Sequence, residues 1–260
     1  RKILSDFVPK TSAGPDNISM KIIKTVAEHL LSPLSLTINQ SLNTGIFPDD
    51  LKLAKVIPLF KKNDPTMLDN YRPISLLPVF SKFFEKVVFK QVYEYFAANK
   101  HFYYSQHGFR KAHSTETAAF EFIDRILTKL DNGQIPIAFF IDLSKAFDTI
   151  DHSILLFKLQ YYGISDTPLK WFKSYLSERK QYVQYGESSS DIINITTGVP
   201  QGSILGPLLF IIYMNDICNA STQFNAVLYA DDTSLISPLC NFNLTSNNNV
   251  SNATLSKNNS

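Results

Sequence analysis

The feature that most constrains this chain is a pair of adjacent carboxylates set between two apolar runs. Asp231 and Asp232 follow the run 226–229 and precede the run 233–236. This pattern predicts two β-strands joined by a turn, with both acids at its tip. Neighbouring negative charges repel each other and weaken such a turn, a cost that a divalent cation shared with a third carboxylate would offset. A plain structural turn is the alternative for these two residues taken alone.

Asp142 is the candidate third carboxylate, because it ends a separate apolar run, 137–141. Magnesium prefers hard oxygen ligands and retains several waters, so a few carboxylates and the phosphates of a substrate suffice to build a site. Two ions held by Asp142 and Asp231 can activate a 3′-hydroxyl and stabilise a departing pyrophosphate, which is nucleotidyl transfer. A metal-dependent nuclease also uses acidic clusters, and these acids alone leave both chemistries open.

The distribution of charge indicates a polyanionic partner. The formal net charge is only +2, but eleven Lys or Arg and four Asp or Glu lie between Lys52 and His113. A basic first half and an acid-bearing second half fit a polyanion held by one part and metal ions held by the other. A solvated helix face around Lys82, Lys86 and Lys90 accounts for many of the same charges without any partner, and the sequence leaves both readings open.

The composition argues against membrane insertion, secretion and disulfide bonding. A hydrophobic content of 44% in 260 residues permits a substantial core. The longest apolar stretch, 204–214, contains Gly206 and Pro207 and is too short to span a bilayer, and the N-terminus lacks a signal-peptide layout. Cys218 and Cys240 have no paired spacing, so we expect free thiols in an intracellular protein with no membrane partner.

Periodicity and turn residues predict the remaining elements. We expect helices from near Asp16 to Leu31, Pro33 to Gly45, Val79 to about Ala97, Ser114 or Thr115 to Asn132, 151–162, 168–176 and 203–217. We expect strands over 51–59, 181–185 and 191–196 besides the three apolar runs near the acids. These runs predict a sheet layer covered by helices on one side. The Asn-rich residues 238–260 are predicted to form a disordered tail.

Seven segments form an ordered series of motifs along nearly the whole chain to residue 237. They are Ser12–Asp16, Val56–Lys61, Asn70–Leu76, Gln106–Arg110, Asp142–Asp148, Gly198–Pro207 and Tyr229–Asp232. In this order they resemble the reverse transcriptases of non-LTR, LINE-type retrotransposons. The resemblance implies an α+β right-hand polymerase with a fingers-like region at 1–134. It further implies a palm at 135–237, in which an antiparallel sheet covered by helices carries the acids, and no thumb.

The same resemblance implies an RNA-directed DNA polymerase of a retrotransposon. A primer 3′-hydroxyl would attack a deoxynucleotide triphosphate with two Mg²⁺ ions, or Mn²⁺ in their place, bound at the acids. The implied partners are an RNA template, a DNA primer and deoxynucleotide triphosphates, and the implied location is the nucleus, the cytoplasm or both. The alternative is a truncated, catalytically silent remnant that still binds nucleic acid. The oligomeric state stays open.

The resemblance also assigns roles near the reacting atoms. It makes Asp142 and Asp231 the catalytic, metal-binding acids, with Asp232 as the third acid beside them. Phe147 matches a bulky residue under the incoming sugar, where a ring would clash with a ribose 2′-hydroxyl; ordinary core packing is the alternative. Gln201 and Gly202 match the segment beside the nascent base pair, where glycine lets the backbone approach the substrate. Cleavage of a nucleic acid needs neither Phe147 nor this segment, which argues against a nuclease.

More distant residues take substrate-binding roles by the same resemblance. Arg72 matches a residue that contacts the triphosphate, for which a planar guanidinium is well suited, and Lys61 is its helper. Gln106, Arg110 and Lys111 match a template-contacting segment, in which we expect Phe109 to pack rather than to stack on a base.

Three observations in the same comparison leave questions open. Asp148 and His152 match the family pattern but have no assigned chemical role, and helix capping by Asp148 or Asp151 is the simple explanation. Beyond Ile236 we find no lysine-bearing segment that would protonate pyrophosphate. No endonuclease domain is identified either, so we expect a fragment or decayed copy of a longer element.

Overall fold

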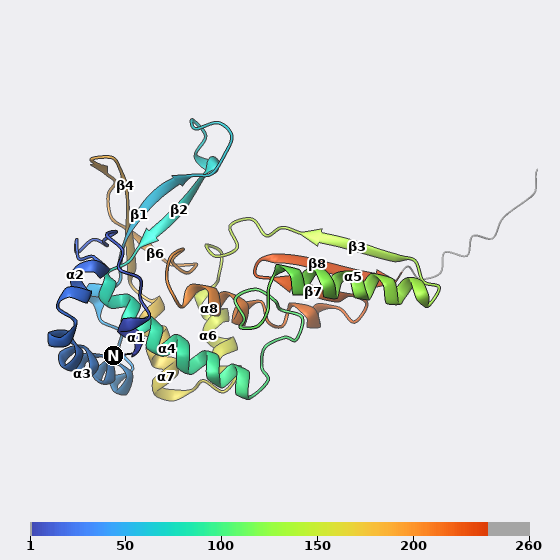
Figure 1. The fold of residues 1–260 in the computed structure, drawn as a ribbon, viewed down its shortest axis with the longest axis horizontal. Coiled ribbons are helices and arrows are strands. Elements are labelled where there is room, and N and C mark those ends of the chain that lie inside the picture. The colour runs from blue at the N-terminus through green and yellow to red at the C-terminus, as the bar shows by residue number, and fades with distance from the viewer. Residues whose placement is uncertain (1, 239–260) are drawn as a thin grey trace, which may run out of the picture.

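The computed structural model describes residues 2–238, which form two β-sheets and a body of helices. One sheet rises above the helical body at one end of the molecule, and the other extends away from that body with α5 along it (Figure 1). This mixed architecture, with mostly antiparallel strands, agrees with the predicted α+β class.

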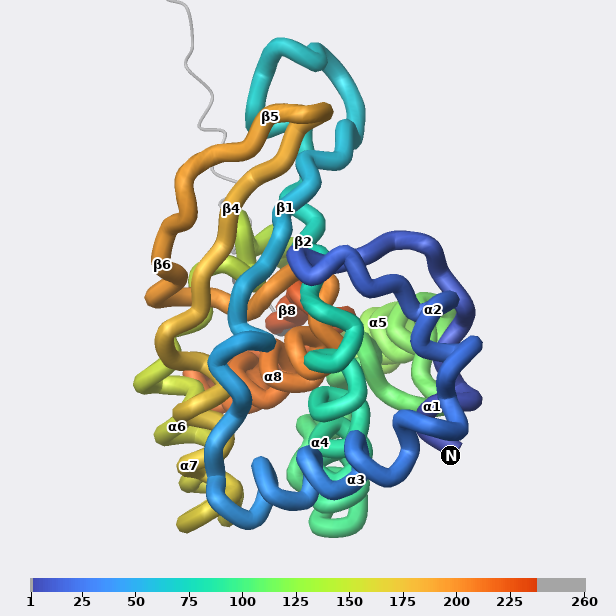
Figure 2. Tube along the Cα trace, turned by 90° about the vertical axis from the view of Figure 1, so that its left-hand side faces the viewer, coloured from blue at the N-terminus to red at the C-terminus, as the bar shows by residue number. Residues whose placement is uncertain are grey.

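The first sheet joins two segments that are far apart in the sequence. Its strands are β1 (Leu53–Phe60), β2 (Tyr71–Leu76), β4 (Arg179–Tyr185), β5 (Ser188–Ser189) and β6 (Ile193–Ile195). β1 pairs antiparallel with β2 and parallel with β4, while β5 and β6 both pair antiparallel with β4. Figure 2 shows β4, β1 and β2 side by side above the helices. β2 contains Pro73 and lies at the edge of the sheet, where a missing backbone N–H is tolerated.

The helical body contains most of the core. Its helices are α1 (Lys2–Ser5), α2 (Met20–Thr25), α3 (Ala27–Thr44), α4 (Val79–Ala98), α6 (His152–Tyr161), α7 (Asp166–Leu176) and α8 (Gly206–Tyr213). α8 is buried on nearly all sides, as its continuous apolar sequence requires. Phe47 is 0% exposed, and its ring meets those of Phe84, Trp171 and Tyr175 edge-on at centroid distances of 5.8, 5.5 and 5.1 Å.

The second sheet has the order β3–β8–β7 and is antiparallel throughout. Its strands are β3 (Pro136–Ile141), β7 (Asn225–Tyr229) and β8 (Asp232–Pro238), and α5 (Thr115–Asp131) packs along them. Phe122 of α5 contacts Phe140 of β3, with ring centroids 5.4 Å apart. This layer is thin, because α5 has no fully buried residue and Phe120 and Phe140 are each 74% exposed.

Two predicted helix starts near the N-terminus are wrong. Asp16 does not begin a helix, because its side chain accepts a hydrogen bond from the Ile18 N–H in a local turn and Ser19 is the N-cap of α2. Pro33 lies inside α3 instead of opening a helix. The predicted end at Gly45 is confirmed, since this residue caps α3 with a left-handed φ of 68°.

The later elements follow the predictions with three differences. α4, α5 and α6 are confirmed, with Ser114 and Asp151 as N-caps of the last two. The predicted helix 203–217 is shorter, because α8 spans Gly206–Tyr213 and a 3₁₀ turn, Ile217–Ala220, follows. The predicted pairing of 181–185 with 191–196 is confirmed only in part, since β6 is three residues long and β4 also joins β1. β2 is absent from the predicted strands because Pro73 obscures its pattern. The remaining short helical segments are the 3₁₀ turns Asp49–Leu51 and Leu68–Asn70.

The predicted division of the chain at residue 134 stays a prediction. β4 lies in one sheet with β1 and β2, so the first sheet draws on both sides of that division. Cys218 is a free thiol, whereas Cys240 and residues 239–260 of the predicted tail lie outside the described residues. No helix in the described part of the chain has both the length and the apolar character needed to cross a bilayer.

The packing around Phe47 generates a test of the core. Phe47→Ala removes a fully buried ring from three aromatic contacts and should lower the free energy of unfolding by about 3–5 kcal/mol, measured by urea denaturation. Ile46→Ala is the matched control, because Ile46 is 51% exposed and its truncation should cost less than about 1 kcal/mol. Equal losses in the two variants would contradict the assignment of Phe47 to the centre of the core.

Candidate functional site

The hairpin of β7 and β8 carries the adjacent carboxylates at its turn. Tyr229 pairs with Asp232, which leaves Ala230 and Asp231 as the two turn residues. Ala230 has a left-handed φ of 56°, as the first position of a tight hairpin turn requires. The predicted arrangement of strand, turn and strand is therefore confirmed in the backbone, although only Asp231 lies in the turn and Asp232 is the first residue of β8.

β3 brings the third carboxylate to the same end of the sheet. It pairs antiparallel with β8, and Ile141 lies opposite Thr233. Continuing this register by one residue sets Asp142 across from Asp232, and residues opposite each other in antiparallel strands share one face of a sheet. Two segments distant in the sequence thus converge on one sheet edge.

The three carboxylates are available to a ligand. Asp142 and Asp232 are exposed, Asp231 is half-buried, and none of them has a hydrogen bond or ion pair with another described residue. Within residues 2–238, no three His, Cys, Asp or Glu side chains are grouped closely enough to hold a metal ion. Carboxylate oxygens are the donors that magnesium prefers, so the donor chemistry fits, although the side chains are not drawn around one point.

Residues 105–108 lie directly behind the acidic turn. The Leu228 N–H donates to the Ser105 carbonyl at 2.9 Å, and the His107 N–H donates to the Leu228 carbonyl at 2.7 Å. The Gln106 side chain is 1% exposed, and its Oε1 accepts from the Ala230 N–H at 3.1 Å. A Cβ at Gly108 would overlap the backbone nitrogen of Ala230, so this close approach requires glycine.

A polar network ties the same segment to α5. Glu121 accepts hydrogen bonds from the Ser105 hydroxyl and from Arg125, each at 2.5 Å, and its other oxygen lies 2.6 Å from Nε2 of His107. Nδ1 of His107 lies 2.8 Å from the Thr117 hydroxyl. Burial raises the pKa of the Glu121 carboxyl, but these hydrogen bonds and the Arg125 charge outweigh burial, and the pKa lies below its usual value.

Phe147 connects this region with the core. Its ring stacks on Phe210 of α8 at a centroid distance of 4.6 Å and meets Phe109 edge-on at 6.2 Å. The Phe147 side chain is half-buried, while Phe109 is 46% exposed. The Val199 N–H donates to the Phe147 carbonyl at 2.9 Å, so the loop that carries Gln201 is attached to the same segment.

Residues 198–202 form a loop held by three neighbours. Nε2 of Gln201 donates to both carboxylate oxygens of Asp148 at 3.1 Å, and the Gln201 carbonyl accepts from the Ser75 N–H of β2 at 2.7 Å. Nε2 of His152 lies 2.7 Å from the Gly198 carbonyl and can only donate to it. Asp148 and His152, which have no role assigned from the sequence, therefore hold this loop in place.

The backbone at position 202 requires glycine. Its φ is 131°, and a Cβ there would lie 2.5 Å from the Ser75 carbonyl oxygen. A cavity of about 290 Å³ opens beside the loop and is lined by residues including Pro73, Ser75, Asp148 and Gln201. Strand β2 and the loop therefore line the same cavity.

Glu85 anchors the chain that follows the loop, a role that the sequence reasoning misses. Its side chain is 0% exposed and accepts from the Ile204 N–H at 2.5 Å and the Leu205 N–H at 3.4 Å. Burial raises the pKa of Glu85, although the charge of the equally buried Arg179 and these hydrogen bonds act in the opposite direction. The signal that could have revealed it is a carboxylate on the buried stripe of α4, in helical spacing with Ser81 and Val88.

Arg72 and Lys61 lie apart from the acids on the β1–β2 arm. Arg72 is exposed on β2 opposite Leu59, and the exposed Lys61 follows β1, where its N–H donates to the Asn70 carbonyl at 2.8 Å. Arg72 is on the other face of β2 from Ser75, because side chains alternate along a strand. No contact in the described residues joins either cation to a carboxylate of the candidate site.

The remaining residues of the predicted template segment, Arg110 and Lys111, contact groups other than the acids. Nη1 of Arg110 donates to the carbonyls of Tyr103, Tyr104 and Gln106 at 2.8, 3.3 and 3.0 Å. Nζ of Lys111 lies 5.2 Å from the centroid of the Tyr93 ring on α4. Lys111 also lines, with Lys86 and Lys90, a cavity of about 620 Å³ on the outside of that helix. The cationic face of α4 is thus continuous with this segment.

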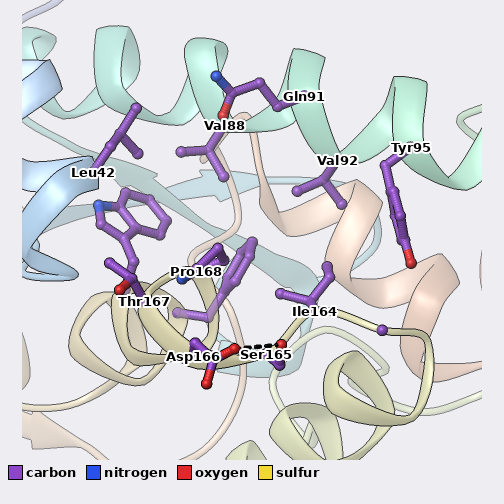
Figure 3. A pocket seen from close by; sticks show the side chains of 13 residues that line it. Leu42, Val88, Gln91, Val92, Tyr95, Ile164, Ser165, Asp166, Thr167 and Pro168 are labelled. Atoms are coloured by element: carbon purple, nitrogen blue, oxygen red, sulfur yellow. Dashed lines mark hydrogen bonds between the residues drawn. The ribbon is translucent and has the colours of Figure 1, made fainter.

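A third, mostly apolar cavity of about 480 Å³ lies between α4 and the start of α7. In Figure 3, Val88 and Val92 of α4 face Ile164 and Pro168 across it. None of the residues with a predicted role lines this cavity, and it is separate from the acidic hairpin.

The structure therefore sorts the predicted residues into two sets. Gln106, Phe109, Phe147, Gln201 and Gly202 form a connected chain of contacts that begins at the acidic turn. Arg110 joins this chain through the Gln106 carbonyl, whereas Arg72, Lys61 and Lys111 stand outside it. Asp142 belongs with the first set through the register of β3 on β8.

Comparison with known proteins identifies the family of the chain. Residues 60–250 match the family described as reverse transcriptase (RNA-dependent DNA polymerase). The chain is 30% identical over 244 residues to the RNA-directed DNA polymerase from mobile element jockey of Drosophila melanogaster, covering 91% of this chain and 26% of that protein. It is 32% identical to the probable RNA-directed DNA polymerase from transposon BS of the same organism, covering 89% and 27% respectively. The chain thus spans about a quarter of the length of these relatives.

Proposed function

Because this chain belongs to the reverse transcriptase family, we propose that it is the RNA-directed DNA polymerase domain of a non-LTR retrotransposon. The observation that carries the proposal is the register of β3 on β8, which sets Asp142 across from Asp232 and beside Asp231. The substrates would be an RNA template, a DNA primer and deoxynucleotide triphosphates.

Two parts of the molecule suit the two tasks of a right-hand polymerase. The β3–β8–β7 sheet with its acidic edge would be the palm, and the β1–β2 arm would belong to the fingers. Arg72 and Lys61 are exposed cations on that arm, as a triphosphate contact requires. The loop 198–202 joins both parts, since it is hydrogen-bonded to β2 and attached to the Phe147 segment.

The reaction would join the primer O3′ to the α-phosphorus, break the bond from that phosphorus to the leaving pyrophosphate and release the hydroxyl proton. Asp142, Asp231 and Asp232 would hold magnesium or manganese ions. When bound, these ions would lower the pKa of the primer hydroxyl and stabilise the charge on pyrophosphate. The register of β3 on β8 brings the backbone of all three acids to one sheet edge, so that only their side chains would have to be ordered by the ions.

Phe147 and Gln201 would shape the place of the incoming nucleotide. The Phe147 ring is supported from behind by Phe210, which limits its retreat from a ribose 2′-hydroxyl. Gln201 is fixed by Asp148 from its side chain and by Ser75 from its carbonyl, and Gly202 lets the loop approach the Ser75 carbonyl closely. These contacts support a rigid floor beside the base pair.

The polymerase proposal is tested by primer extension. The chain should extend a DNA primer on an RNA template with Mg²⁺, and Asp231→Asn with Asp232→Asn should lower the rate by at least about a hundredfold, because neutral amides are poorer ligands for a hard cation. Asp191→Asn, at an exposed acid beside β6, is the matched control and should leave the rate unchanged. Absence of extension by the unsubstituted chain, with RNA binding retained, would instead support a silent nucleic-acid-binding remnant.

Sugar selection provides a second test. Phe147→Ala should increase ribonucleotide incorporation relative to deoxynucleotides by roughly tenfold or more, because the clash with a 2′-hydroxyl is relieved; competition between the two triphosphates measures the ratio. Phe109→Ala removes a ring that contacts Phe147 but is expected only to pack, and it should leave the ratio unchanged. An unaltered ratio in Phe147→Ala would reject the proposed role of that ring.

A further inference from the structure

Two features destabilise the acidic turn. Asp231 and Asp232 carry adjacent charges with no compensating partner among the described residues. Ala230, which precedes them, has a left-handed backbone conformation that is unfavourable for a residue with a Cβ. A turn of this kind keeps one geometry only if its surroundings fix it.

The Gln106 side chain contacts the turn at Ala230. We infer that Gln106 is a positioning residue, which holds Asp231 and Asp232 in register with Asp142 by fixing the backbone of Ala230. The inference rests on the proposed function for the role of the acids, whereas the contact itself is a property of the fold. Gln106 touches neither the substrate nor the acids and acts only through the turn.

The hydrogen bonding of Gln106 identifies the atom that matters. Its two partners, the Ala230 N–H and the Gly108 N–H, are both donors, so the amide oxygen has to face them. The amide nitrogen is buried and has no hydrogen-bond partner among the described residues. Burying an unpartnered donor is costly, so the side chain is useful here for its acceptor oxygen.

The support behind Gln106 is rigid. His107 is hydrogen-bonded to Leu228 through its backbone and to Thr117 and Glu121 of α5 through its ring. Gly108 allows the segment to approach the turn so closely that a methyl group would displace it. The position of the acidic turn is therefore set from α5 through residues 105–108. Catalytic carboxylates are sensitive to such placement, because small displacements of reacting groups cost large factors in rate.

The experiment compares four variants of the whole chain. Gln106→Met is nearly isosteric but lacks a strong acceptor, and Gly108→Ala forces the turn away while leaving Gln106 intact. Gln106→Glu keeps an acceptor oxygen, because burial behind two acids favours the neutral, protonated form of its carboxyl. Ser41→Ala is the control, because it removes a buried hydroxyl that contacts Trp171 and Ile46 in the α3–α7 region, away from the turn.

Two readouts are measured on each variant. Amide hydrogen exchange over residues 225–234 reports the turn without any need for activity, and the Mg²⁺ concentration for half-maximal primer extension reports the placement of the acids. In Gln106→Met and Gly108→Ala, exchange at the turn should be about tenfold faster and the half-maximal Mg²⁺ concentration several-fold higher. Both values should stay near those of the unsubstituted chain in Gln106→Glu and Ser41→Ala.

Several results would overturn the inference. Unchanged exchange at the turn in both Gln106→Met and Gly108→Ala would show that the Gln106 contact does not stabilise the turn. Equally faster exchange at the turn in Ser41→Ala would show that the effect is general destabilisation of the protein. Faster exchange with an unchanged Mg²⁺ requirement would exclude a positioning role for the acids. If the unsubstituted chain does not extend a primer at all, the polymerase proposal fails, and with it the catalytic part of the inference. The exchange data still decide whether Gln106 fixes the turn.

Discussion

The position of β8 between β3 and β7 is the constraint on which the rest of the candidate site depends. β7 and β8 adjoin in the sequence and form a hairpin, but β3 lies nearly a hundred residues earlier and reaches the sheet only by pairing with the other edge of β8. Because side chains alternate along a strand, a shift of this pairing by one residue would send Asp142 to the opposite face. The whole chemical proposal therefore rests on one register.

Polar contacts, half-buried around Glu121 and fully buried at Glu85, support the elements around this register. α5 has no fully buried residue, so Glu121, Arg125 and His107 contribute what apolar packing does not. On the other side, Glu85 of α4 holds the backbone at Ile204, just after the loop 198–202. Carboxylates on two helices thus secure residues 105–108 and the backbone that follows the loop 198–202.

The sequence predicted local structure well wherever the signal was local. Ser114, Asp151 and Gly45 mark helix ends by their own backbone preferences, and the structure has them as caps. The predictions at Asp16 and Pro33 were wrong. Both residue types often begin helices, but Asp16 lies in a turn and Pro33 lies inside α3. Both choices depend on neighbouring contacts that no local pattern contains.

The arrangement of the site could be predicted only in part. The acids stand out from apolar runs, but the parallel pairing of β1 with β4 joins segments over a hundred residues apart and leaves no periodic signal. Gln106 illustrates the same limit: its residue type suits a template contact as well as a hydrogen bond to Ala230. Only the fold shows that its side chain is buried behind the turn. The roles of these residues depend on contacts between segments that are distant in the sequence.

The register of β3 on β8 is tested most directly by a cysteine cross-link. With Cys218 and Cys240 replaced by serine, Asp142→Cys with Asp232→Cys should form an intramolecular disulfide on mild oxidation, because opposite residues of antiparallel strands have Cα atoms within about 5.5 Å. Asp142→Cys with Asn225→Cys should not, since Asn225 pairs with Ile236 near the other end of β8. A disulfide in the second pair but not the first would contradict the account.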